Sequence, residues 1–429
     1  MEKKISASPW SWVPTLYLAE GLPYFAVNTI SVLMFKRLGM SNADVAFYTG
    51  WLYLPWVIKP FWSPFVDIIK TKRWWVVTMQ IVMALGIAAV GLTIPSKMPP
   101  QGSLFMICLL MFYIIGFASA THDIAADGYY MIALNSSQQS LFVGIRSTFY
   151  RLASIFGQGV LVVIAGILET KSGNIPFAWR VTFIGLSVLF LAIALYHAFI
   201  MPRPAADSNV LEGRNSSVIK EFFGTFGSFF KKPQVVIAIL FFMFFRLPEA
   251  QLVKLITPFL VDPVEVGGLG LSTTSVGVIY GTFGVLGLTV GGILGGILAS
   301  RGGLKKWLWP MVLALTLPDL VYCYLAMAQP SNMFIINSCV ILEQFGYGIG
   351  YTAFSLYMMY FADGEHKTSH YAICTGIMAL GMMVPGMIAG WVQEQLGYVG
   401  FFWYVGACCI VTWVLAALIK IDPEFGKKK

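Results

Sequence analysis

The chain has 429 residues, of which 58% are hydrophobic and 11% are charged, and its mean hydropathy is +0.75. A soluble domain carries about 25% charged residues, so this composition excludes a large soluble core and predicts an all-α protein that crosses a membrane many times. A net charge of +8 alone would suit a nucleic-acid-binding protein, but the positions of the charges explain it without nucleic acid as a partner.

Apolar runs long enough to span a bilayer follow one another along the chain. A spanning helix needs about 20 mostly apolar residues, and twelve runs of this kind occur, at 10–35, 43–69, 74–95, 104–134, 140–169, 178–201, 234–261, 273–299, 306–328, 333–361, 370–395 and 398–420. One long polar segment separates the first six from the last six. We therefore predict an N-terminal six-helix half over 1–201, a cytoplasmic linker over 202–233 and a C-terminal six-helix half over 234–429.

The loops on the two sides of the predicted membrane differ in charge. With the N-terminus inside, eighteen Lys and Arg residues fall on the cytoplasmic side and five on the other side. This is a strong positive-inside bias, which predicts a multi-pass protein with both termini in the cytoplasm. Two six-helix halves around a central loop are typical of the major facilitator superfamily fold, in which the substrate site lies between the halves.

Six ionisable residues lie inside the spans of the first half. At a rise of about 1.5 Å per residue they all fall at comparable depth in the cytoplasmic half of the membrane: Glu20, Lys59, Asp123, Asp127, Arg146 and Arg151. Charges inside spans are costly and mark functional sites. Three acids and three bases can neutralise one another as a fixed structural network, or some of them can form a gate or proton site that opens and re-forms as the halves move.

The pair Asp123 and Asp127 favours the second interpretation, because residues four apart share one helix face. We therefore assign all six residues to a proton-coupling charge network. His122, beside the first aspartate, is interpreted as a packed polar residue.

The second half has fewer buried charges. FFRLPEAQLVK (244–254) contains Arg246, Glu249 and Lys254, and Pro248 predicts a broken helix. Broken helices in the membrane line sites, because their free backbone groups must face protein or water. Glu343 and Gln344 lie inside the tenth span. We assign these five residues to substrate binding.

Neither a metal nor a cofactor is expected. The six cysteines and four histidines lie scattered, without metal-ligand or disulfide spacing. A membrane-embedded enzyme would need a nucleophile–base or metal constellation, so we predict a protein that is not an enzyme.

Several stretches resemble the AmpG muropeptide permease family: GLPY (21–24), KPFWSPFVD (59–67), DIAADGYY (123–130), YRLA (150–153), ITPFL (256–260) and EQFGYGIGYTAF (343–354). The resemblance covers both halves in order. It implies a proton-driven permease of the bacterial inner membrane that imports GlcNAc–anhydro-muramic acid, with or without a stem peptide. It also implies that the family's buried acids correspond to Asp123 and Asp127, its lysine to Lys59, its arginine to Arg151 and its span-ten acid to Glu343. Tyr24, which ends the first motif, is added to the substrate site.

Two departures from the family pattern leave the substrate open. RLPEA (246–250) stands where the family reads K-L-G-D-A, and Ala19 and Glu20 stand where small hydroxyl residues are usual. N-acetylmuramic acid or another sugar acid is therefore an alternative cargo. A further alternative is an efflux pump for a drug-like compound, for which a less charged cavity is expected. In each case the predicted partners are a small molecule, protons and membrane lipid, and a monomer is expected.

Overall fold

A computed structural model describes residues 8–96, 99–100, 102–134, 136–204, 207, 224, 226–363 and 367–426. Within these ranges all regular structure is helical and no β-strand occurs, which confirms the predicted all-α class. The α-helices are α1 (Val13–Phe25), α2 (Ser31–Arg37), α3 (Asn42–Trp51), α4 (Leu54–Ile68), α5 (Lys72–Thr93), α6 (Gly102–Ala133), α7 (Ser136–Ser154), α8 (Val162–Ser172), α9 (Ile175–Ile200), α11 (Val235–Phe244), α12 (Leu247–Val261), α13 (Thr273–Val278), α14 (Val285–Gly302), α15 (Leu304–Thr316), α16 (Leu320–Ala328), α17 (Met333–Ala362) and α18 (Lys367–Leu418).

Ten helical stretches among the described residues are long and apolar enough to cross a bilayer. One of them, His370–Leu418, covers two predicted spans and bends at Gly397, whose φ of 65° is left-handed. The predicted span over 43–69 is divided between α3 and α4. The multi-pass architecture is confirmed, while the count of twelve spans stays a prediction.

The helix break predicted at Pro248 is present. Helix α11 ends at Phe244 and α12 begins at Leu247, with Pro248 in its first turn. A proline is tolerated there because the first turn of a helix leaves its N–H groups unpaired in any case. The break places Arg246 at the junction, as the N-cap residue of α12.

Large apolar side chains cover the outer faces of the helices. Leu92 and Phe199, for example, are 73% and 88% exposed. A protein in water rarely exposes so much contiguous apolar surface, whereas a helix in lipid satisfies its backbone internally and can present such a face. These faces therefore belong against lipid.

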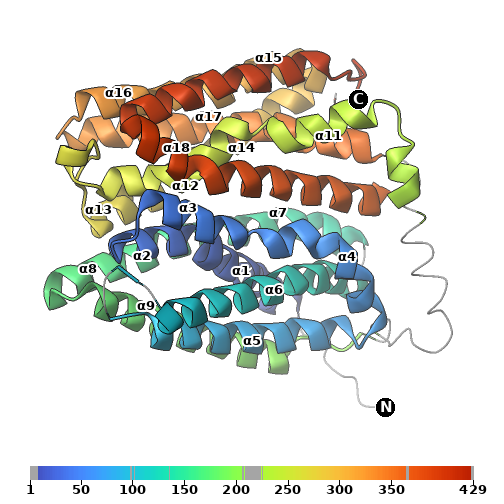
Figure 1. Cartoon of the computed structure of the whole chain (residues 1–429). Helices are drawn as coiled ribbons and strands as arrows, with labels where there is room; N and C mark the ends of the chain where they lie inside the picture. The colour runs from blue at the N-terminus through green and yellow to red at the C-terminus, as the bar shows by residue number, and fades with distance from the viewer. Residues whose placement is uncertain are drawn as a thin grey trace.

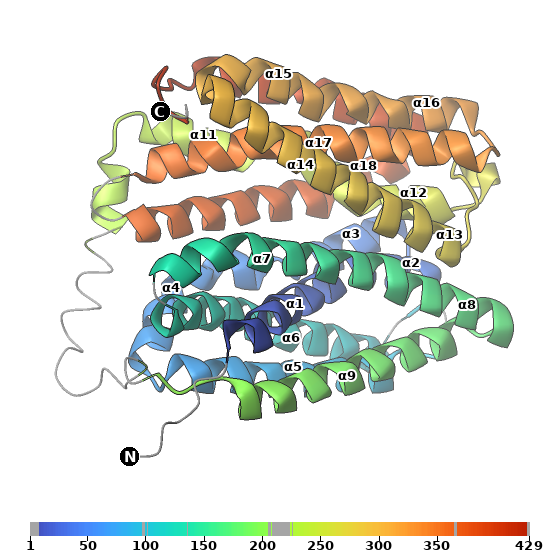
Figure 2. The same cartoon turned by 180° about the vertical axis from the view of Figure 1, so that it is seen from behind.

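The helices form two groups that lie side by side. Helices α1 to α9 occupy the lower part of Figure 1, and α11 to α18 occupy the upper part; the reverse view in Figure 2 shows the same division. The predicted linker is described only at 202–204, 207, 224 and 226–233, so most of it lies outside the described residues. The boundaries of the two halves stay a prediction.

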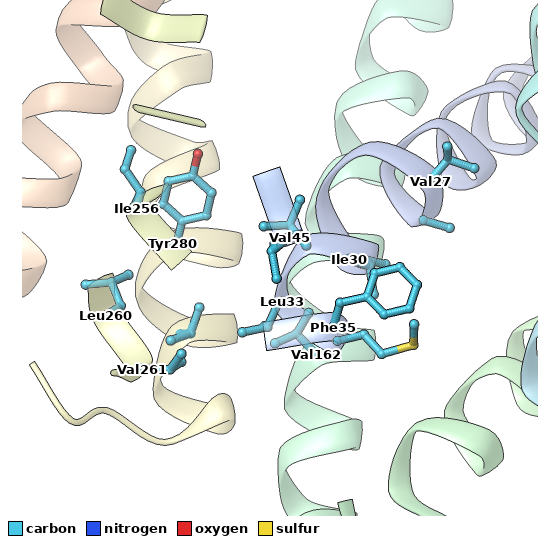
Figure 3. Close-up of a cluster of buried hydrophobic side chains, with 14 of the residues drawn as sticks. Val27, Ile30, Leu33, Phe35, Val45, Val162, Ile256, Leu260, Val261 and Tyr280 are labelled. Atoms are coloured by element: carbon cyan, nitrogen blue, oxygen red, sulfur yellow. The ribbon is translucent and has the colours of Figure 1, made fainter. Parts of the chain in front are cut away.

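One end of the bundle is tightly packed across the two groups. We call it the closed end: α2 ends there at Arg37 and α13 begins there at Thr273. The opposite end, where α9 ends at Ile200 and α11 begins at Val235, is called the linker end. Figure 3 shows the apolar part of the packing near the closed end, in which Leu33 and Val162 of the first group face Leu260 and Val261 of the second.

Glycines allow the closest approach of the two groups. A Cβ added at Gly281 would lie 1.9 Å from the carbonyl oxygen of Gln158, and one at Gly390 would lie 1.9 Å from that of Asn42. Because both obstacles are backbone atoms, no side-chain rotation can relieve the clash.

Gly281→Ala is therefore expected to separate the groups at this end and to lower the melting temperature of the purified protein. Gly185→Ala is the matched control, since no atom lies within 4 Å of its added Cβ. Equal melting temperatures for the two variants, measured by differential scanning fluorimetry, would contradict the importance of this contact.

Candidate functional site

A cavity of about 1250 Å³ lies between the two groups of helices. Its walls come from α1, α4, α6 and α7 on one side and from α12, α14, α17 and α18 on the other. The lining extends to Met131 and Met359, which are near the linker end and are 55% and 44% exposed. The cavity therefore reaches the linker end of the bundle.

Polar contacts join the two groups at the closed end. Asp262, after α12, forms an ion pair with Lys36 of α2 at 2.8 Å and accepts a hydrogen bond from the Tyr398 hydroxyl at 2.5 Å. Glu169 of α8 forms an ion pair with Arg37 at 2.9 Å and accepts a hydrogen bond from Thr273 of α13 at 2.7 Å. The Lys36–Asp262 and Thr273–Glu169 contacts cross from one group to the other and close this end, while the Arg37 and Tyr398 contacts hold the two acids in place.

The first charged pair of the cavity wall is formed by Lys59 of α4 and Asp123 of α6. The Lys59 ammonium lies 3.3 Å from Asp123 Oδ2, and the indole N–H of Trp56 donates to the same oxygen at 3.3 Å. The side chains are 30% and 16% exposed. Asp123 is thus held on two sides and is the more enclosed of the two aspartates on α6.

The second pair is formed by Arg146 of α7 and Asp127 of α6. Arg146 lies 2.8 Å from Asp127 Oδ1, which also accepts a hydrogen bond from the Tyr17 hydroxyl at 3.0 Å. The guanidinium stacks over the rings of Tyr17 and Tyr130, at 4.5 and 5.2 Å from their centroids. The Asp127 side chain is 45% exposed and lines the cavity, so water can reach it.

Glu20 and Arg151, the remaining members of the predicted network, are not paired with each other. Glu20 lies within electrostatic reach of both ion pairs, and its Oε2 is buried without a hydrogen-bond partner in the described part of the chain. Arg151 points across the cavity and donates to the Thr289 hydroxyl of α14 at 3.4 Å. Among the described residues, the pairs and Glu20 thus bring three carboxyl groups and two cations together around α6, whereas Arg151 contacts the other group of helices.

The two kinds of acid should respond differently to removal of their charge. Asp123→Asn leaves the Lys59 ammonium without its carboxylate, which should lower the free energy of unfolding by at most about 3 kcal/mol, because the pair is partly exposed. Glu20→Gln removes an acid whose buried oxygen has no partner, so it should leave the melting temperature unchanged or raise it. Thermal unfolding of the two variants in detergent tests this contrast, and a larger loss for Glu20→Gln would contradict it.

In the second group, the break before α12 brings Arg246 against α17. Arg246 donates to the Tyr347 hydroxyl, and its guanidinium stacks over the rings of Tyr351 and Phe354, at 5.0 and 5.9 Å from their centroids. Glu249, in the first turn of α12, is 4% exposed and lines the same cavity. Tyr24 and Gln344 also contribute to the lining.

Lys254 and Glu343 lie outside this lining. Lys254 is 1% exposed, donates to the Thr49 hydroxyl at 3.0 Å and lies 5.0 Å from the ring centroid of Tyr53. Glu343 is also 1% exposed and accepts hydrogen bonds from Tyr322 and Gln344, both within 3.1 Å of Oε2. The structure thus separates these two residues from the cavity-facing Arg246 and Glu249.

His122 packs on the opposite side of α6 from the ion pairs. Its Nε2 lies 3.0 Å from the side-chain nitrogen of Gln80 on α5, and the Gln80 oxygen contacts His197 at 2.9 Å. This agrees with its interpretation as a packed polar residue.

Four residues that contribute to the site were not selected from the sequence. Trp56 and Tyr17 hold the aspartates, and Glu169 and Asp262 hold the closed end. Tyr17 precedes Glu20 by three residues, a spacing that places both on one face of α1. The two acids stand at span ends on the side with few cations, and that location is the signal that could have identified them.

Comparisons with known proteins agree with this architecture. A model of the Major Facilitator Superfamily matches residues 15–369. The chain is 26% identical over 400 residues to a putative transporter, AmpG 4, of Rickettsia conorii, with 90% of each chain covered. It is 23% identical over 378 residues to the anhydromuropeptide permease of Escherichia coli K12, covering 86% of this chain and 71% of that protein. The crystal structure of a D-xylose–proton symporter superposes with a TM-score of 0.73 at 11% identity, covering 97% of this chain and 98% of that one.

Proposed function

Because the chain belongs to the Major Facilitator Superfamily and is therefore a multi-pass membrane transporter, we propose that it imports cell-wall-derived amino sugars or muropeptides across the bacterial inner membrane, coupled to protons. The observation that carries the proposal is the charged cavity between the two groups of helices, closed at one end and reaching the other. Alternating access, in which two halves rock around a central site, requires such a cavity.

The size and lining of the cavity favour a polar cargo of this kind. Pockets for drug-sized ligands measure about 300–1000 Å³, and this cavity, at about 1250 Å³, exceeds them. Its lining combines aromatic side chains with the charged residues Lys59, Asp127, Arg151, Arg246 and Glu249. Such a lining suits a sugar with ionised groups better than the apolar compounds carried by efflux pumps. The relative named anhydromuropeptide permease points to the same substrate class.

Proton coupling is supported by the excess of acid around α6. Among the residues that the structure describes, three carboxyl groups share two cations there, and Glu20 Oε2 is buried without a hydrogen-bond partner. A carboxylate without a partner is far more costly to bury than a neutral carboxyl, so a cluster with one surplus acid suits one bound proton. A proton that neutralises Asp127 would also remove its attraction to Arg146 and release α7 from α6.

The open end of the cavity suits the proposed import, although an exporter also passes through such a state. The positive-inside bias puts the linker in the cytoplasm, and the cavity reaches the linker end. In this orientation the structure corresponds to an inward-facing state, from which an imported substrate leaves. Lys36, Arg37, Glu169 and Asp262 then close the periplasmic side.

Proteoliposomes containing the purified chain provide the test. With an inward proton gradient, labelled GlcNAc–anhydro-muramic acid should accumulate, and a protonophore should abolish the accumulation. Liposomes without protein serve as the control. Failure to take up this disaccharide, its stem-peptide form or N-acetylmuramic acid would overturn the substrate class, and accumulation that survives the protonophore would overturn the coupling.

A further inference from the structure

The cavity contains charged groups that the protein itself does not neutralise. In the part of the chain that the structure describes, five charged residues line it. Lys59 and Asp127 belong to the ion pairs with Asp123 and Arg146. Among the residues that the structure describes, the other three, Arg151, Arg246 and Glu249, take part in no ion pair. The unpaired lining charge is therefore two cations and one acid, a surplus of one positive charge.

Rings hold Arg246 in place, and among the described residues it forms no ion pair, although Glu249 lies within electrostatic reach. Tyr347, Tyr351 and Phe354 of α17 contact its guanidinium, with centroid distances of 5.4, 5.0 and 5.9 Å. Its Nε is buried and has no hydrogen-bond partner among the described residues. Stacking fixes the plane of a guanidinium and leaves its N–H edge free to bind an oxyanion in two-pronged geometry. Arg246 is thus oriented for an anion.

Arg151 approaches from the other group of helices. It lies on α7 and donates to the Thr289 hydroxyl of α14 at 3.4 Å. Its guanidinium also lies against Gly292 of α14, where an added Cβ would be 3.2 Å from Arg151 Nη2. It also lies within electrostatic reach of Tyr351, the ring over which Arg246 stacks. The two arginines therefore approach the same tyrosine from opposite walls of the cavity.

We propose that Arg151 and Arg246 together bind the carboxylate of the substrate, and that Glu249 accepts a hydrogen bond from a hydroxyl or amide group of its sugar ring. The ligand class is a sugar acid with a net charge of −1, of which the lactyl ether of a muramic acid is an example. This inference rests on the proposed function and deepens it, because it states which part of the cargo is recognised. Lys59 and Arg146 are excluded because each already pairs with an aspartate, and Lys254 is excluded because it is 1% exposed and lies outside the cavity lining.

The position of the two arginines links binding to movement. Two like charges facing one cavity repel each other, and an anion between them replaces this repulsion by two attractions. Because one arginine belongs to each group of helices, the bound carboxylate favours conformations in which the groups approach each other. A ligand can shift a conformational equilibrium only through such differential contacts. A neutral sugar would lack this effect.

Binding to the purified full-length chain in nanodiscs, measured by tryptophan fluorescence, tests the inference. The probes are GlcNAc–anhydro-muramic acid and the methyl ester of its lactyl group, which differ only in charge and one methyl group. The wild-type chain should bind the acid about tenfold or more tightly than the ester, as expected for hydrogen bonds to a charged group. Arg246→Gln and Arg151→Gln should each remove most of this preference, mainly by weakening binding of the acid. Arg180→Gln is the matched control, since Arg180 binds the Ile94 carbonyl and Ser96 away from the cavity.

The outcomes separate the inference from the function on which it rests. If the wild-type chain binds neither probe, the proposed substrate class is wrong. If it binds acid and ester equally, or if the arginine variants weaken both probes to the same extent, the carboxylate subsite is wrong while the transport function stands. The comparison of acid with ester on the wild-type chain needs no variant, so it decides the matter even if the arginine variants fail to fold.

Discussion

Asp127→Asn is expected to abolish proton-driven accumulation of substrate while exchange of labelled for unlabelled substrate continues. Asparagine keeps the shape of the side chain and its contact with Tyr17, but it cannot bind a proton. Without coupling, the proton gradient no longer drives the substrate, so the internal concentration should rise only to the external one. Uptake and counterflow assays in the same proteoliposomes measure the two activities separately.

Two further variants serve as controls for this experiment. Asp127→Glu retains a group that can bind a proton and should keep part of the accumulation. Asp422→Asn changes an exposed acid beyond the last helix and should behave as wild type. If Asp127→Asn accumulates substrate as well as Asp422→Asn does, the coupling proposal is wrong for Asp127, and Glu20→Gln becomes the next variant to test.

The three acids around α6 differ in a way that suggests separate tasks. Asp123 is 16% exposed and is held by Lys59 and Trp56, which suits a structural link between α4 and α6. Asp127 is 45% exposed and faces the cavity, which suits exchange of protons with water. Glu20 lies within electrostatic reach of both. A proton taken up at Asp127 therefore changes the electrostatic potential at Asp123 and Glu20, because low-dielectric surroundings strengthen each interaction.

Much of the fold was predictable because a bilayer imposes simple rules on sequence. Length and hydropathy located the spans, and Pro248 located the break between α11 and α12. The bends within spans were not predicted. Ala26–Ile30 and Ile279–Gly284, for example, form wider π-helical turns inside apolar runs. Such turns depend on packing between helices and leave no mark in a hydropathy pattern.

The site was predicted less completely, because depth along a helix does not determine the direction of a side chain. Counting residues placed Arg146 and Arg151 at similar depth on α7. They lie five residues apart, so Arg146 turns toward Asp127 whereas Arg151 turns toward Thr289 of the other group. Likewise, Lys254 lies two turns beyond Arg246 on α12 but reaches Thr49 and not the cavity. Only the tertiary arrangement distinguishes a cation that is bound within the protein from one that is free to bind substrate.

The second large effect is expected at the closed end. Asp262→Asn combined with Thr273→Val removes the Lys36 ion pair and the hydrogen bond to Glu169, both of which join the two groups of helices. The Arg37–Glu169 pair, which lies within the first group, remains. Each 1.4 kcal/mol lost from this end changes the ratio of open to closed molecules about tenfold. The test uses a chain in which the six native cysteines are replaced by serine and Leu260→Cys is the single labelling site, because Leu260 is fully buried in the wild-type chain. In this background, Asp262→Asn with Thr273→Val should make maleimide labelling several-fold faster.

Arg180→Gln in the same single-cysteine background is the control, because the side-chain hydrogen bonds of Arg180 among the described residues go to Ile94 and Ser96 within the first group. If the double variant and this control are labelled at equal rates, the Lys36–Asp262 and Thr273–Glu169 contacts do not hold the end closed. The apolar packing of Leu33 and Val162 against Leu260 and Val261 (Figure 3) and the hydrogen bonds of Asn42 to Gln393 and Tyr398 would then hold it. The distinction matters for the transport cycle. Ion pairs can be exchanged for water as the end opens, whereas apolar surface exposed in a polar pathway costs about 25 cal/mol for each Å². A closed end held mainly by charge therefore opens at lower cost, and the pairing of Lys36 and Arg37 with two acids is the arrangement expected of an end that must open in every cycle.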